Sequence, residues 1–593
     1  MFSNNPDLPS LSNKKVITNK TQKIIRKSNS SRRRRRDFPF GRLRLLFVYP
    51  RPTQPILFFK GGGSMSGRRV VALYALLVGC FAAVVCRLYW LCSNPAYAAR
   101  AAAQSVVTLR LPARRGNFYD CDGHLLTGLG IKWEALCVPG EGNYTRLFSC
   151  TDAAGQALLY QKRNALAPFF LEVEQDVSAL GISCWPVPVR SPAAPLAEHL
   201  IGYVDGDGKG AAGLEAAFDA ALSGTGEGDT LTCLVNAQGK LRETPEQTHA
   251  DSGAVGVQLT LSRDVQRAAE AVAARMMTTG SIVVLETAGA EVRACVSVPG
   301  YDPADPAASL NAPDSPMLNR AFQSYAVGSV FKPVLAAAAL EAGETGLVYH
   351  CPGWCEVDGQ IFRCAGGTAH GEVDLAAALE KSCNGYFIRL GQTLGAERVR
   401  TLAEQLGFGR TVELTDSFRT AAGKLPELAA LTSSGAYANF CFGQGELLAT
   451  PVQIAGMLNA LMTGIYREPL FLRNTLDETT GEPLTPLAHR RAEQVVSEGT
   501  ASALRMLLAG VVENGTGHEA ALPETTAAGK TGTAQTGQFR DGVELKNNWF
   551  AGVFPAEKPQ YTIVVLQDAQ TVPAHSSAAI FAALAEMLEN FSA

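Results

Sequence analysis

The stretch 325-YAVGSVFK-332 decides the fold of this chain, because it places Ser329 three positions before Lys332. That spacing puts both side chains on one face of a helix. Two short patterns follow in order, Ser-Cys-Asn at 382–384 and Lys-Thr-Gly-Thr at 530–533. Each pattern is weak alone, but K-T-G occurs once in the chain, and the ordered set is far more specific than its parts. The sequence therefore predicts that three distant segments meet at one site.

Length and composition bound the architecture. With 593 residues and 47% hydrophobic content, the chain can bury at least two sizeable cores, so two or three domains are expected. The net charge of −2 hides an asymmetry, because residues 1–69 hold seventeen Lys and Arg but only two Asp. A polybasic start before an acidic body argues against a nucleic-acid-binding protein.

Residues 1–64 lack sustained periodicity and are rich in Pro, Asn, Ser and Arg, which predicts a disordered basic extension. This extension either lies beside a membrane surface or is not translated. The codons for the Lys-Gly-Gly before Met65 can form a purine-rich ribosome-binding site, so our hypothesis is that translation begins at Met65. Mass spectrometry of the native N-terminus tests this, and any peptide from residues 1–60 would contradict it.

An apolar run at residues 70–86 predicts a single membrane-spanning helix within 65–95. Arg68 and Arg69 precede the run, so the positive-inside rule places a short stub in the cytoplasm and the rest of the chain outside. A cleaved signal peptide is the alternative, because Ala-Tyr-Ala at 96–98 resembles a cleavage site. The length of the run favours an uncleaved anchor in the cell membrane.

Fourteen cysteines in a largely extracytoplasmic chain would ordinarily predict disulfides, but these are scattered without a regular framework. Cys351, Cys355 and Cys364 can form one loop disulfide or bind a metal. With only His370 nearby and no second C-x-x-C pattern, the metal interpretation is the weaker one. We therefore expect no metal and no cofactor, and the disulfide state of the three cysteines stays open.

The remaining patterns predict two domains after the anchor. Residues 96–255 carry turn signals such as the Asp-Gly at 122–123, and packing with turn chemistry accounts for them. In residues 256–593, β-branched runs near both ends enclose alanine-rich helical segments. This arrangement predicts an α+β domain with an antiparallel sheet. The expected strands are 281–285 and 292–298, which form a hairpin around Gly289, and 548–554 and 561–566.

The ordered motifs identify a resemblance to the class B penicillin-binding proteins, which are monofunctional peptidoglycan D,D-transpeptidases, from Met65 to the C-terminus. Further segments match the family pattern: 115–123, 210–215, 301–303, 318–321, 442–445 and 450–453. The resemblance implies a serine penicillin-recognising fold at 256–593 and an extended, non-catalytic pedestal (dimerisation-like) domain at 96–255. Val327 and Val330 depart from the usual family residues, and these changes concern substrate and β-lactam affinity more than activity.

The resemblance also implies roles for the motif residues. Ser329 is the expected nucleophile, and Lys332 is an amine that burial can keep partly neutral to take the serine proton. Ser382 is expected to relay protons, and Asn384 to donate to the substrate amide. The third motif would hold the terminal carboxylate of a D-Ala-D-Ala stem through Lys530, Thr531 and Thr533, with the oxyanion hole made by backbone N–H groups of Ser329 and Thr533. Gly532 is expected to leave room for the substrate along the strand.

The acceptor of the acyl group distinguishes a transpeptidase from a β-lactam-hydrolysing relative. The hydrolase needs a carboxylate that activates water, and Glu380 and Glu446 stay open as candidates. A β-lactam sensor and a non-catalytic cell-wall scaffold also stay open as functions. The anchor and the pedestal favour cross-linking of stem peptides, with β-lactams as inhibitors. The resemblance implies a multispanning glycan polymerase as partner, and it leaves open whether the role is in division, elongation or sporulation.

Overall fold

The computed structural model describes residues 67–592 except 112–114, 140, 141, 192, 193, 227, 237, 252 and 488–491. The predicted basic extension and the suggested start at Met65 lie outside the described residues. Within the described part of the chain, α1 (Gly67–Ser93) is the one helix long and apolar enough to cross a membrane. Its 27 residues extend about 40 Å, which is sufficient for a hydrocarbon core. The structure thus has a helix that is long and apolar enough for the predicted membrane span.

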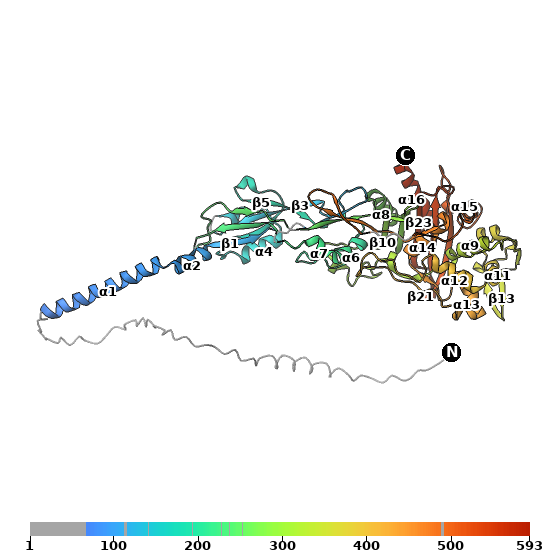
Figure 1. Ribbon diagram of the computed structural model, residues 1–593, viewed down its shortest axis with the longest axis horizontal. Helices are drawn as coiled ribbons and strands as arrows, with labels where there is room; N and C mark the ends of the chain where they lie inside the picture. Colours follow the sequence, from blue (N-terminus) through green and yellow to red (C-terminus); the bar gives the residue numbers. More distant parts are fainter. Residues whose placement is uncertain are drawn as a thin grey trace, which may run out of the picture. The chain divides into compact units, whose positions relative to one another are not determined.

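Residues from Cys92 onward form one compact unit, and its largest sheet is antiparallel throughout (Figure 1). The strand order is β10 (Glu291–Val298), β9 (Gly280–Glu286), β23 (Tyr561–Gln570), β22 (Val543–Phe554) and β21 (Ala528–Arg540). All four strands expected from the sequence are present, and the predicted hairpin around Gly289 is the β9–β10 pair. The predicted α+β class is thus confirmed.

Helices cover both faces of this sheet, which explains why its central strands are apolar without alternation. Ile282 and Val284 on β9 pack into a core with the helices at 263–276 and 577–592, whereas Val283 and Leu285 face a second core that includes the helices at 332–342 and 451–463. Successive side chains of a strand point to opposite faces, so a strand buried on both sides is apolar at every position. The helices of this region are α8 (Arg263–Met276), α9 (Lys332–Ala342), α10 (Leu375–Glu380), α11 (Asn384–Leu394), α12 (Ala396–Gln405), α13 (Ser434–Cys441), α14 (Pro451–Thr463), α15 (Glu498–Glu513) and α16 (Ser577–Ser592).

The segment before residue 255 builds smaller sheets. One has the order β1 (Val106–Arg110), β6 (Thr230–Leu234), β7 (Glu246–Thr248), and another the order β4 (Phe169–Val173), β3 (Gly130–Cys137), β5 (Cys184–Val189). A four-stranded sheet combines β2 (Phe118–Tyr119) with β8 (Val255–Leu259), β18 (Leu472–Asp477) and β19 (Pro483–Pro486). Because β8 crosses the boundary expected at 255/256 and pairs with strands from both sides, the division into pedestal and catalytic domains stays a prediction.

Buried charges hold together the segments 115–123 and 210–215. The Arg115 guanidinium donates to Glu215 Oε2 at 2.8 Å and to Asp219 Oδ1 at 2.7 Å. Arg190 donates to the other oxygen of the same Glu215 carboxylate, which is almost fully buried. Removal of one charged partner of a buried carboxylate strongly destabilises the folded protein. These residues therefore organise the fold, and none of them contacts the motif residues through an ion pair among the described side chains.

Candidate active site

The first motif forms a tight turn that leads into a helix. Gly328–Phe331 is one turn of 3₁₀ helix, and α9 begins directly after it at Lys332. Gly328 has φ of 66°, which favours glycine, and its N–H donates to the carbonyl of Gly443 at 2.7 Å. Ser329 is half-buried, whereas Val330 and Lys332 are buried. The serine therefore stays accessible at the start of a helix whose following residues are fixed in the core.

Lys332 joins the first motif to the second. Its Nζ donates to the Ser382 carbonyl at 2.7 Å, to Ser382 Oγ at 3.1 Å and to Asn384 Oδ1 at 2.7 Å. Within the described part of the chain no carboxylate pairs with this buried amine. Burial lowers the pKa of Lys332 to about 7, because the charged form is poorly solvated there. The lysine can therefore exchange a proton near neutral pH.

The second motif lies on a strained turn between α10 and α11. Ser382 has φ of 53°, a left-handed value that is uncommon for a residue with a side chain. Cys383 is the N-cap of α11, and its Sγ accepts from the Tyr386 N–H at 3.5 Å. Asn384 Nδ2 donates to the Arg363 carbonyl at 2.8 Å, which orients its Oδ1 toward Lys332. The structure thus brings Lys332, Ser382 and Asn384 together.

The third motif lies on β21, at the edge of the large sheet. Lys530 is fully buried, and its Nζ donates to the carbonyl and the Oγ1 of Thr531, each at 3.2 Å. Burial lowers the pKa of Lys530 well below its usual value, and the nearby charge of Lys332 lowers it further. Thr533 is exposed, and Thr531 Oγ1 lies 2.8 Å from Thr516 Oγ1. The sequence did not single out Thr516, although the Asn-Gly-Thr-Gly at 514–517 is a turn signal.

Close packing gives Gly532 a structural reason of its own, beside the expected one. A Cβ at this position would lie 2.9 Å from Val330 Cγ1 and 3.2 Å from the Val330 nitrogen. A Cβ at Gly328 would likewise lie 2.9 Å from the Thr533 carbonyl oxygen. The two glycines thus allow the serine turn and the K-T-G strand to pack directly against each other. That Gly532 also leaves room for a substrate stays a prediction.

Neighbouring family segments support the same turn. A Cβ at Gly443 would lie 1.9 Å from the Gly328 carbonyl oxygen, so the 442–445 segment also needs glycine for close packing. The buried Trp549 donates its Nε1–H to the Ala326 carbonyl at 3.0 Å. Arg320 forms an ion pair with Asp568 at 3.2 Å, a partner that the sequence did not indicate. The turn that carries Ser329 is therefore held from several sides.

The two carboxylates that remained open as water activators lie in other contacts. Glu446 forms an exposed ion pair with Lys424 at 3.2 Å. The Glu380 carboxylate lies on the side of α15, where it would be 3.0 Å from a Cβ at Gly510. Neither carboxylate has a hydrogen bond to a motif residue among the described contacts, so the geometry gives no support to a hydrolase of this kind.

Residues 280–586 match the family model described as the penicillin binding protein transpeptidase domain. This region is just over half of the chain and includes all three motifs.

Curated relatives extend the similarity beyond that domain. Stage V sporulation protein D of Bacillus subtilis is 30% identical over 393 residues, which cover 64% of this chain and 59% of that protein. Penicillin-binding protein PbpB of Mycobacterium tuberculosis is 30% identical over 426 residues, covering 66% and 60%. The probable peptidoglycan D,D-transpeptidase PenA of Neisseria meningitidis is 26% identical over 506 residues, covering 79% and 82%. The chain thus spans about three fifths of the length of the first two relatives.

Solved structures share the fold. Penicillin-binding protein 3 of Mycobacterium tuberculosis, complexed with aztreonam, superimposes with a TM-score of 0.60 at 25% identity, covering 82% of this chain and 97% of that one. A chain of a peptidoglycan synthase complex has a TM-score of 0.64 at 24% identity, covering 88% and 97%, and at this identity it shows the fold alone. With the family model, the curated relatives and the solved structures in agreement, the chain belongs to the penicillin-binding protein transpeptidase family.

Proposed function

We propose that this chain is a membrane-anchored peptidoglycan D,D-transpeptidase that cross-links stem peptides through a serine ester and that β-lactams inhibit. The observation that carries the proposal is the buried Lys332 amine, which follows the Ser329 turn and whose Nζ lies 2.7–3.1 Å from three oxygens of the S-x-N turn. An amine with a pKa of about 7 can accept the proton of an attacking hydroxyl near neutral pH.

In the proposed reaction, Ser329 Oγ attacks the carbonyl carbon of the penultimate D-Ala, and Lys332 takes the hydroxyl proton. The bond to the terminal D-Ala breaks, and the leaving amine receives a proton through Ser382. The amine of a second stem then attacks the ester carbonyl and gives up a proton to Lys332. The bond to Ser329 Oγ breaks, the serine oxygen takes that proton back, and the cross-link is formed.

The other motif residues bind the donor stem in this proposal. Asn384 donates to the backbone of the stem, and Lys530, Thr531 and Thr533 hold its terminal carboxylate. The N–H groups of Ser329 and Thr533 stabilise the oxyanion, which is commonly a large term in acyl transfer. The close packing of Gly532 against Val330 supports this assignment, because it fixes the strand relative to the nucleophile turn.

The membrane topology and the partner belong to the same proposal. Arg68 and Arg69, at the N-terminal end of α1, favour a cytoplasmic N-terminus, with the motif residues outside. Glycan strands would come from a multispanning polymerase, which the family resemblance implies. The large N-terminal segment before residue 255 then serves as the pedestal.

Labelling of the full-length protein in detergent with a fluorescent penicillin tests the proposal. We expect a stable adduct over hours, its loss in Ser329→Ala, and its retention in the matched control Ser502→Ala on α15. An adduct that disappears within minutes would instead support a hydrolase. No adduct with the folded protein would support a non-catalytic scaffold.

A further inference from the structure

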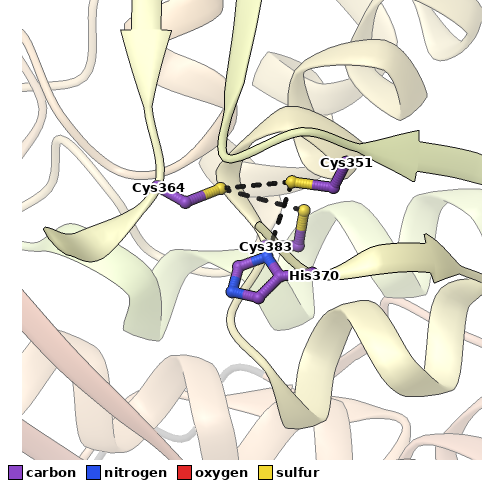
Figure 2. Close-up of side chains that lie close together, drawn as sticks. All are labelled: Cys351, Cys364, His370 and Cys383. Atoms are coloured by element: carbon purple, nitrogen blue, oxygen red, sulfur yellow. Dashed lines mark hydrogen bonds between the residues drawn. The ribbon is translucent and has the colours of Figure 1, made fainter. Parts of the chain in front are cut away.

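A cluster of three cysteines and one histidine surrounds the S-x-N turn. Cys351 ends β12 (Tyr349–Cys351), Cys364 follows β14 (Gln360–Arg363), and His370 precedes β15 (Gly371–Val373). Cys383, the N-cap of α11, completes the group. One donor atom from each residue lies within 4.8 Å of all the others. Figure 2 shows the sulfur of Cys364 facing those of Cys351 and Cys383, with the His370 ring below them and joined to Cys351 by a dashed line.

Three of the six distances between these donors match those of a tetrahedral metal site, and the other three lie within 4.8 Å. Sulfur atoms bound to Zn²⁺ at about 2.3 Å in a tetrahedron lie about 3.8 Å apart, and a sulfur and a histidine nitrogen lie about 3.6 Å apart. The two short sulfur pairs are 3.7 Å for Cys351 with Cys364 and 3.9 Å for Cys364 with Cys383. Cys351 Sγ lies 3.6 Å from His370 Nδ1. These three distances therefore agree with one shared ion.

The surroundings also suit thiolate ligands. All three cysteines are buried, whereas His370 is partly exposed. Backbone N–H groups point at two of the sulfurs, from Gly353 to Cys351 at 3.4 Å and from Tyr386 to Cys383 at 3.5 Å. Such donors stabilise the negative charge of a thiolate. Metal ligands are commonly held in this way by a second layer of hydrogen bonds.

A disulfide does not account for the arrangement. Bonded sulfurs lie about 2.05 Å apart, whereas the closest pair here is 3.7 Å apart. All fourteen cysteines are among the described residues, and none of them is paired. A bond between Cys351 and Cys364 would also leave Cys383 and His370 without a shared role. One shared metal ion accounts for all four donors, which come from four separate segments, whereas a single disulfide accounts for two.

We propose that Cys351, Cys364, Cys383 and His370 bind one Zn²⁺ ion in a closed, structural site. Three thiolates and one imidazole in a tetrahedron are a ligand set that zinc favours. Four protein ligands leave no open position for water or substrate, so the ion takes no part in bond making. Its role is positional, because Cys383 lies between Ser382 and Asn384 and is thereby tied to β12 and to the loops around β14 and β15.

The ion would fix the turn that contacts Lys332. The strained φ of Ser382 needs support from its surroundings, and a bond from the metal to the next residue supplies it. The inference stands apart from the proposed transpeptidase reaction, since zinc binding does not require Ser329. It also explains how closely spaced thiols can stay unpaired outside the cytoplasm, because bound zinc blocks their oxidation.

Elemental analysis of the full-length protein, purified in detergent without chelator, is the first test. We expect about one zinc per chain, and after exchange with Co²⁺ an absorption spectrum with thiolate charge-transfer and tetrahedral bands. X-ray absorption at the zinc edge should fit three sulfurs and one nitrogen. A metal-free protein in which the thiols of Cys351, Cys364 and Cys383 all react, a Cys351–Cys364 disulfide seen by mass spectrometry, or zinc with oxygen ligands only would overturn the proposal.

Variants localise the site. Cys351→Ser and His370→Gln should lower the zinc content at least tenfold at equal protein, and Cys355→Ser is the matched control because Cys355 is also buried but lies outside the cluster. Equal zinc in Cys351→Ser and in Cys355→Ser would contradict the assignment. If the ligand variants fail to fold, the Co²⁺ spectrum of the unaltered protein decides alone.

A last variant separates the two proposals. Ser329→Ala should keep its zinc while losing the penicillin adduct. If Ser329→Ala loses the adduct and keeps its zinc, both proposals are supported. If the unaltered protein forms the adduct but is purified without zinc, only the metal site is overturned.

Discussion

Two sides of the site are built by different kinds of interaction. The K-T-G strand, residues 530–533 of β21, is held by a continuous backbone ladder in which Lys530 pairs with Ala551 and Thr533 with Asn548. The S-x-N turn, residues 382–384, has no such ladder within the described chain. Its N–H groups bond to the end of α10, and its other contacts come from side chains, above all Lys332 and the cysteine cluster.

This difference predicts which substitutions each side of the site tolerates. The backbone hydrogen bonds of a ladder do not depend on most side chains. Substitutions in the K-T-G strand should therefore lower activity mainly where the packing leaves no space for a larger side chain. A turn held by side chains depends on each partner. Substitutions on the two sides should therefore differ in kind as well as in size.

The largest expected effect is on the S-x-N side. Lys332→Met removes the proposed base and leaves the Ser382 carbonyl and Asn384 Oδ1 without their donor. Loss of a positioned general base costs roughly 10²- to 10⁴-fold, and we expect about 10³-fold in the second-order rate of acylation by fluorescent penicillin. Lys558→Met, on an exposed lysine, is the control. A loss below tenfold in a folded Lys332→Met protein would mean that another group takes the serine proton.

The K-T-G strand should respond to a single methyl group. In Gly532→Ala the new Cβ meets Val330 Cγ1 at 2.9 Å, so the nucleophile turn must shift. Displacement of about 1 Å can cost 10²-fold, and we expect a loss of roughly 10- to 100-fold in the acylation rate. Gly346→Ala, where nothing lies within 4 Å, should keep the full rate. Equal rates for both variants would show that the two segments are not packed as described.

Sequence reasoning succeeded where local pattern determines structure. The runs of β-branched residues predicted the β9–β10 hairpin. The ordered motifs predicted segments that the fold brings together, since Lys332 bonds to the S-x-N turn and Gly532 packs against Val330. Their specificity lies in the ordered combination, because S-x-x-K and S-x-N each recur elsewhere in the chain by chance. A helix start and a turn need few residues to be recognised, so these features could be predicted without knowledge of the packing.

The members of the cysteine cluster could not be predicted from local sequence patterns. In the sequence, Cys355 is closer to Cys351 than any other cysteine, yet it lies on β13 (Trp354–Val357), whose buried face packs against Phe362 and Ile388. Cys383 instead joins the cluster from a helix start about thirty residues away. Strand alternation and tertiary packing select the partners, and neither can be read from spacing. The close approach of Gly532 to Val330 escaped prediction for the same reason.

The pH dependence of acylation should show the buried amine directly. Burial lowers the pKa of Lys332 from the usual lysine value to about 7. The amine is therefore mostly neutral at pH 8 and mostly protonated at pH 6. Only the neutral amine can take the serine proton, so the rate should rise about tenfold from pH 6 to pH 8. Stopped-flow labelling over this range, with folding monitored by circular dichroism, measures the profile. A flat or falling profile would remove Lys332 as the base.

The smallest expected effect tests how far the K-T-G strand depends on side chains. Thr516→Val removes the 2.8 Å hydrogen bond between Thr516 Oγ1 and Thr531 Oγ1 but keeps the shape of the side chain. One such bond contributes about 1 kcal/mol, so the acylation rate should fall no more than about fivefold. Thr432→Val, which alters an exposed threonine outside the site, is the control for threonine loss. Because the ladder to β22 holds the strand without this bond, a loss near that of Lys332→Met would mean that the strand, too, is positioned by its side chains.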